Sequence, residues 1–161
     1  NPDPLFSDNV NFFVKSYLIN ACTYLEAYIQ EVTFGFAKSI SLRANLASIP
    51  HNFLYWKTAK ELRDKDLKFA VAKFDVTKQE IADEISANPY RTIRLFRLLG
   101  VDLPKFEKFQ TNKELVNFVV TKRNNIIHHN DTANDISFDD IESYIDCFLE
   151  YMHGIKDSVS A

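Results

Sequence analysis

The stretch VNFFVKSYLINACTYLEAYIQEVTFGF, residues 10–36, indicates the fold class because its apolar residues return every three or four positions. The repeating positions are Val10, Phe13, Val14, Tyr17, Leu18, Ala21, Cys22, Leu25, Tyr28, Ile29, Val32 and Phe36. This spacing aligns them on the face that an α-helix buries, and we expect its aromatic rings in the core or in dimer packing. The sequence therefore predicts a long first helix, capped by Ser7 or Asp8, kinked at most by Gly35 and stopped by Pro50.

The composition agrees with a protein built from helices. The chain of 161 residues holds fourteen Phe and seven Tyr but only three Gly and five Pro, too few for a turn-rich β-fold. Cys22 and Cys147 each lie in an apolar helical pattern, which favours reduced thiols and a cytoplasmic protein. We expect no membrane span, since no run of about 18 uncharged apolar residues occurs. The first residue is not Met, so we expect a longer parent chain.

Start and stop signals divide the remainder into further helices. They are the capping boxes TKQE (77–80) and TNKE (111–114), the cap Asn88 before Pro89, the left-handed stop Gly100, and Ser137 before an acidic first turn. A less regular helix is expected from about Phe53 to Leu62, ahead of the charged segment RDKDLK. We predict an all-α bundle of about five helices, with long first and last helices, forming one domain over residues 1–161.

Charge is distributed unevenly along this acidic chain, whose net charge is −3. Residues 88–123 carry eight basic and three acidic side chains, whereas residues 124–161 carry one basic and eight acidic ones. Arg91, Arg94 and Arg97 form a basic ridge on one predicted helix, which is either an ordinary solvated face or a track for phosphates. Lys122 lies near the end of the basic block and belongs to the same predicted RNA-binding group.

The segment KRNNIIHHND, residues 122–131, breaks the apolar pattern of the helix that contains it. At about 100° per residue, the apolar side chains of this helix occupy one arc, and we expect that arc to face the core. Its members are Leu115, Val116, Phe118, Val119, Val120, Ile126 and Ile127. Asn124 and His128 share the opposite, polar face, but Arg123 falls inside the apolar arc. A buried guanidinium needs a partner, and Glu26 on the first helix is the predicted one, leaving other N–H groups for a phosphate.

The spacing Arg-x4-His, from Arg123 to His128, late in a helical domain and before a final helix, resembles the signature of the HEPN superfamily. The segments NPYRTIRLFRLLGVDL and RNNIIHH are similar to those of RiboL-PSP and MAE-type HEPN domains, and the likeness covers about residues 9–155. This resemblance implies a homodimer that cleaves RNA without a metal ion or another cofactor. It implies that Arg123 stabilises the phosphorane, His128 transfers protons, and Asn124 holds the substrate or the imidazole.

Alternatives remain open at each of these positions. His129 is a second candidate for the working histidine, and both histidines also suit a helix C-terminus, where they interact with the dipole. Adjacent residues on a helix point about 100° apart, so the pair is a poor metal site and we expect none. The leading interpretation is a toxin-like or antiphage ribonuclease that acts on RNA and is controlled by an antitoxin or another regulatory protein. The alternative is an inactive helical module for dimerisation or for binding nucleotides or partners.

Overall fold

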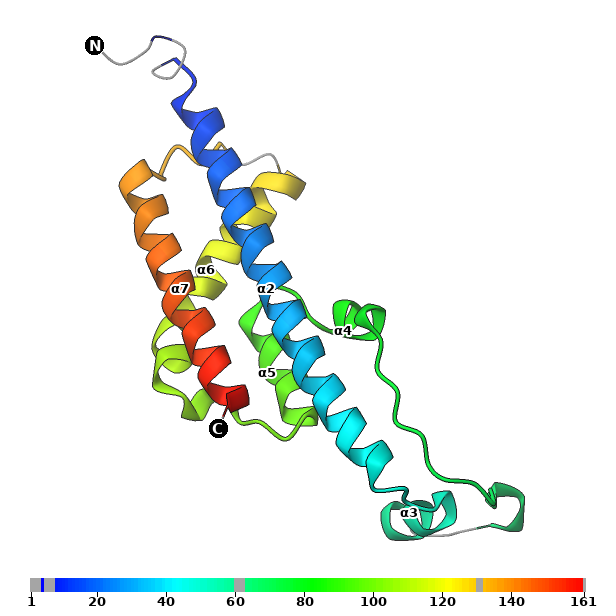
Figure 1. Cartoon of the computed structure of the whole chain (residues 1–161). Coiled ribbons are helices and arrows are strands. Elements are labelled where there is room, and N and C mark those ends of the chain that lie inside the picture. Colours follow the sequence, from blue (N-terminus) through cyan, green and yellow to red (C-terminus); the bar gives the residue numbers. More distant parts are fainter. Residues whose placement is uncertain (1–3, 5–7, 60–62, 130–131, 161) are drawn as a thin grey trace.

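One helix, α2 (Val10–Leu46), runs the length of the molecule, and the other long helices pack along its first two thirds (Figure 1). The computed structural model describes residues 4, 8–59, 63–129 and 132–160. The remaining elements are α3 (His51–Thr58), η1 (Asp64–Asp66), α4 (Lys78–Glu84), α5 (Pro89–Leu98), η2 (Leu103–Lys105), α6 (Glu107–His129) and α7 (Phe138–Ser160). The described residues thus form an all-helical bundle with six α-helices, which confirms the predicted fold class.

Helix α2 buries a narrow stripe of small and aliphatic side chains. Its buried positions are Val14, Leu18, Cys22, Leu25, Ile29, Thr33 and Ala37. The rings of Phe12, Tyr17 and Tyr24 are exposed, so these three do not pack in the core of the chain, and the alternative expectation of dimer packing stays a prediction for them. The helix continues through Gly35 and ends at Leu46, before Ser48, whose φ is 51°. Asn9 is the N-cap and makes no side-chain capping bond; Asp8 is therefore not the cap, and Ser7 lies outside the described residues.

Helices α6 and α7 form an antiparallel pair that packs against α2, and they approach closely because one position is glycine (Figure 1). A Cβ on Gly154 would lie 2.5 Å from the backbone nitrogen of Phe109. The ring of Phe109 stacks on Tyr151 with centroids 4.6 Å apart, and both residues are fully buried. This contact fixes the first turn of α6 against the last turns of α7.

Most predicted caps are confirmed. Thr77 and Glu80 form the capping box of α4, and the Asn88 side chain accepts from the backbone of Tyr90 and Arg91 at the start of α5. Gly100 has a φ of 83°, as the predicted left-handed stop requires. Helix α4 ends at Glu84 rather than continuing to residue 87. The capping box predicted at 111–114 was wrong, because α6 already begins at Glu107.

The far end of α2, α3 and the extended chain that returns to α4 make a projecting arm (residues 38–75; Figure 1). The Asn45 side chain bonds to both the N–H and the carbonyl of Phe74, each at 2.9 Å, which ties the returning chain to α2. Helix α3 starts at His51 and ends at Thr58, earlier than predicted, and residues 60–62 lie outside the described residues. The bundle's core cluster includes none of the described residues of the arm. Among the described helices, none is both long and apolar enough to cross a membrane.

Candidate functional site

Three consecutive residues of α6, Lys122, Arg123 and Asn124, point in three directions. Lys122 reaches the connection to α7, Arg123 reaches α2, and Asn124 is exposed to solvent. Successive side chains on a helix differ by about 100° in direction, so two anchored neighbours fix the rotation of α6 about its axis. That rotation places the polar face of α6 outward.

Arg123 is held by Glu26, as the break in the apolar pattern predicted. Its Nη2 lies 3.2 Å from Glu26 Oε2, and the Arg123 and Glu26 side chains are 19% and 31% exposed. The Nε of Arg123 is buried and meets no acceptor among the described residues. The carboxylate therefore neutralises the guanidinium without using all of its five N–H groups. The buried Nε is out of reach of a ligand, but the remaining amino N–H groups of this partly exposed side chain are donors for an incoming phosphate oxygen.

Cys22 lies one helical turn before Glu26 on α2, close enough to the Arg123–Glu26 ion pair to interact with both charges. Burial raises the pKa of the Cys22 thiol to about 11, while the guanidinium of Arg123 acts in the opposite direction. The thiol is therefore neutral at physiological pH and packs as a small apolar group beside the ion pair. The sequence contained a signal for this position, since Cys22 and Glu26 are four residues apart on one face of the first helix.

Asn124, His128 and His129 are all exposed at the end of α6. His128 lies five helical steps after Arg123, a rotation of about 500°, which leaves the two side chains about 140° apart. Within one chain, the guanidinium therefore faces α2 while the imidazole faces away from it. The guanidinium and the imidazole therefore lie on the same helix but point in different directions.

The polar face of α6 meets the start of α5. Asn88 Nδ2 lies 3.4 Å from Asn117 Oδ1, and Asn117 precedes Asn124 by about two turns on the same side of α6. The hydroxyl of Tyr90 donates to Glu114 Oε1 at 3.0 Å, one turn before Asn117. These contacts bring the N-terminal end of the basic ridge beside the polar face that carries Asn124.

The basic ridge is exposed as a row, but its members differ in their surroundings. Arg91 Nη2 donates to the carbonyl of Asp83 at 2.7 Å, and Arg94 pairs with Glu84. Arg97 is also exposed, and the described residues show no ion pair for it. The row therefore consists of two arginines tied to the end of α4 and a third facing solvent.

Lys122 differs most from its expected place. Its ammonium lies 2.8 Å from Asp135 Oδ1 and 3.0 Å from Oδ2, and its side chain is only 14% exposed. The partner sits in the connection between α6 and α7, where no periodic pattern could reveal it from sequence. Lys122 was predicted to bind RNA, but in the structure its ammonium group is already bound by the Asp135 carboxylate.

Fewer of the apolar side chains of α6 are buried than the sequence pattern predicted. Val116, Val119, Val120 and Ile126 are buried, but Leu115, Phe118 and Ile127 are substantially exposed. Arg123 lies near the middle of the buried arc, which explains why it needs Glu26. Among the described residues, no group of three or more His, Cys, Asp or Glu side chains is arranged to hold a metal ion.

The helical bundle and the Arg-x4-His segment on α6 define a HEPN-type domain. The chain belongs to the RiboL-PSP-HEPN family, whose model matches residues 1–161. No curated protein and no solved structure matches the chain.

Proposed function

We propose that the protein is a metal-independent endoribonuclease that acts as a homodimer. The observation that carries this proposal is the anchored guanidinium of Arg123, five residues before an exposed His128 on the same helix. A charge-stabilising arginine and a proton-transferring histidine are the two groups that RNA transesterification needs. A histidine suits the task because its ordinary pKa, about 6.5, lets both protonation states exist near neutrality.

The reaction uses the 2′-hydroxyl of the substrate as nucleophile. One imidazole removes the 2′ proton, the 2′ oxygen bonds to phosphorus, and the bond from phosphorus to the 5′ oxygen breaks. The leaving 5′ oxygen receives a proton from an imidazolium, and the products are a 2′,3′-cyclic phosphate and a 5′-hydroxyl. Arg123 stabilises the charge that develops on the phosphoryl oxygens, and Asn124 holds the substrate or the imidazole. DNA lacks the nucleophile and is not cleaved.

A second chain explains how Arg123 and His128 act on one phosphate. Within one chain they point about 140° apart, so a two-fold axis beside the end of α6 would bring the arginine of one protomer toward the histidine of its partner. The surface also offers apolar area for a protein partner. A groove of about 300 Å³ between α2 and α7 is lined in part by Tyr17, Tyr24 and Leu149, all exposed.

Cleavage is tested with purified protein, mixed RNA and excess chelator. We expect wild-type cleavage to persist, with cyclic phosphate ends, and His128→Ala to lower the rate at least about 100-fold. His153→Ala is the matched control, since His153 is exposed on α7 and pairs with Glu150. Arg123→Lys is preferable to Arg123→Ala because it retains a charge beside Glu26. Unaltered cleavage in His128→Ala would contradict the assigned role, and His129→Ala would then identify the alternative.

Mixing inactive variants tests whether the site is shared. If arginine and histidine come from different protomers, dimers of Arg123→Lys with His128→Ala contain one intact pair, and activity returns to a fraction of wild type. No recovery in confirmed mixed dimers would contradict the composite site. Dimerisation without cleavage of any RNA would favour the inactive interaction module.

We further propose a toxin-like or antiphage role in which a regulatory protein restrains the nuclease. The reason for this proposal is that an unrestrained ribonuclease would threaten the RNA of its own cell. Expression of the wild type should slow growth, and His128→Ala should relieve the effect. Equal growth inhibition by both forms would argue against this role.

A further inference from the structure

The end of α6 needs a restraint if it carries a working histidine. His128 and His129 occupy the last turn, where backbone carbonyls lack helical partners and helices tend to fray. A misplacement of about 1 Å in a reacting group can reduce a rate about 100-fold. What holds the last turn of α6 therefore matters to the proposed reaction.

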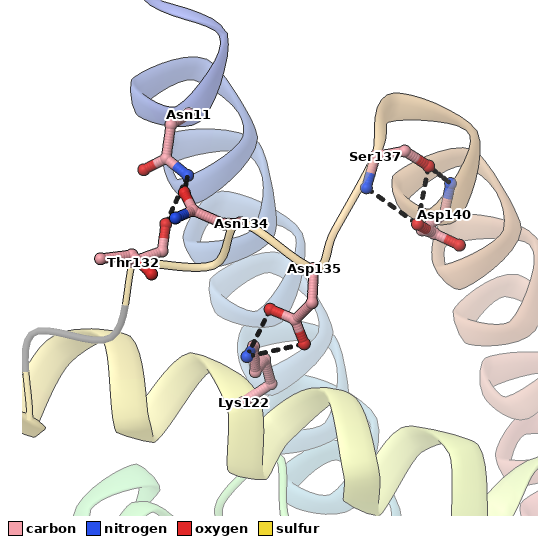
Figure 2. Close-up of polar contacts among 7 residues, drawn as sticks. All are labelled: Asn11, Lys122, Thr132, Asn134, Asp135, Ser137 and Asp140. Atoms are coloured by element: carbon pink, nitrogen blue, oxygen red, sulfur yellow. Dashed lines mark hydrogen bonds and ion pairs between the residues drawn. The ribbon is translucent and has the colours of Figure 1, made fainter.

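Residues 132–135 lie beside α6 and are tied to it by an ion pair. Asp135 accepts from the Lys122 ammonium at 2.8 and 3.0 Å, thirteen positions later in the chain (Figure 2). Lys122 lies about two turns before the helix end, so this ion pair closes a loop that contains Asn124, His128 and His129. The Lys122 side chain is mostly covered, whereas the Asp135 carboxylate is 65% exposed, so the geometry of the pair rests on the covered lysine.

The connection is also tied to the start of α2. The Asn11 side-chain nitrogen donates to the carbonyl of Thr132 and, at 2.8 Å, to Asn134 Oδ1 (Figure 2). Between these two acceptors, Ala133 is fully buried and adopts a φ of 53°. Thr132 follows His129 by three residues, a reach of about 11 Å at most, so the clamp limits where the end of α6 can move.

The other end of the connection is fixed at α7. Ser137 N–H donates to Asp140 Oδ2 at 2.8 Å, and Asp140 N–H donates to the Ser137 hydroxyl at 3.1 Å, a reciprocal cap (Figure 2). We call residues 132–137 the strap. It is held by α2 at its start, by α6 in its middle and by α7 at its end.

We propose that the strap positions His128, and that Lys122, Asp135 and Asn11 are positioning residues for the reaction rather than contacts to RNA. This inference rests on the proposed function. The Lys122–Asp135 pair fixes the last two turns of α6 from one side, while Arg123–Glu26 fixes the helix from the side of α2. Together they set the direction in which His128 projects.

Exchanging the two charges distinguishes positioning from phosphate binding. Lys122→Glu and Asp135→Lys should each lower kcat about tenfold with little change in KM, because each breaks the pair. The double variant Lys122→Glu/Asp135→Lys should recover most of kcat. If Lys122 instead bound RNA, the exchange would not rescue, KM would rise in Lys122→Glu, and the salt dependence of binding would weaken. That result would overturn the proposal.

A readout independent of cleavage is the NMR signal of the His128 imidazole, assigned by its loss in His128→Gln. In Lys122→Glu and in the milder variant Asp135→Asn, the signal should shift or broaden, and the charge exchange should restore it. The His153 signal should stay constant, which controls for unfolding. An unchanged His128 signal in folded single variants would overturn the strap's role. A strap-dependent signal in a protein that cleaves no RNA would instead refute the proposed function alone.

Discussion

At the residue scale, the Asp140 carboxylate closes the start of α7 and makes the stability of the fold depend on pH. Hydrogen bonds from the Ser137 hydroxyl and backbone N–H hold the pKa of Asp140 below its ordinary value. The stabilisation is therefore fully present above the unfolded pKa, about 4, and is lost as pH falls through the lower folded value.

Replacing Asp140 should reduce this acid sensitivity. We expect Asp140→Asn to be less stable than wild type at pH 6 and to converge with it as the pH approaches 2. Urea unfolding midpoints across this range measure the difference. Asp139→Asn is the control, because Asp139 occupies the same first turn without the reciprocal bonds to Ser137. A constant gap between wild type and Asp140→Asn down to pH 2 would contradict the linkage.

Single residues also show which parts of the site the sequence could predict. Arg123 was identifiable because a charge inside an apolar helical arc demands a partner, and Glu26 among the apolar residues of the first helix was the available one. Asp135 was not, because it lies in an irregular connection where spacing carries no information about direction. The role of Lys122 was therefore inferred from its charge alone. The charge of a lysine does not reveal which carboxylate pairs with it.

At the scale of elements, local signals predicted helix starts only where packing agreed with them. Thr77, Asn88 and Ser137 cap helices as expected, since their side chains satisfy nearby backbone N–H groups. The TNKE segment has the same local chemistry but lies inside α6, because burial of Phe109 against α7 draws the helix start back to Glu107. Tertiary packing decides between competing starts, and the sequence does not display that packing.

The close contact of α6 with α7 gives a prediction about two glycines. Gly154→Ala should lower the free energy of unfolding by about 1–3 kcal/mol, because its Cβ would overlap the backbone of Phe109, which cannot move aside. Gly35→Ala should raise it by about 0.5–1 kcal/mol, because Gly35 is exposed in mid-helix with open space around it. Denaturant unfolding measures both. Equal effects of the same sign would contradict the inferred packing.

At the scale of the whole molecule, the arm and the bundle are separable in their stability. The core cluster draws its buried residues from Val14 to Ala37 and from Ile81 onward, and none of the described residues in 38–75 belongs to it. The chain also returns close to where it left the bundle. Lys78 Nζ lies 2.8 Å from Glu31 Oε2 and 5.4 Å from the centre of the Phe34 ring.

We therefore expect the bundle to fold without the arm. Residues 38–75 would be replaced by about eight Gly and Ser residues, whose typical span is about 16 Å. The shortened protein should keep a cooperative thermal transition and a helical circular dichroism spectrum. An insoluble or non-cooperative product would show that the arm contributes to the core after all.

Lys122, Arg123 and Asn124 point in three different directions, so a shift of one residue along α6 would misplace all three side chains. Insertion or loss of one residue between Phe109 and Lys122 would turn all three side chains by about 100° relative to α2 and the strap. Such a lesion would barely alter composition, net charge or helix content, so spectroscopy of the backbone would report an intact protein. Both ion pairs would nevertheless be broken, and the guanidinium would be swung away from Glu26.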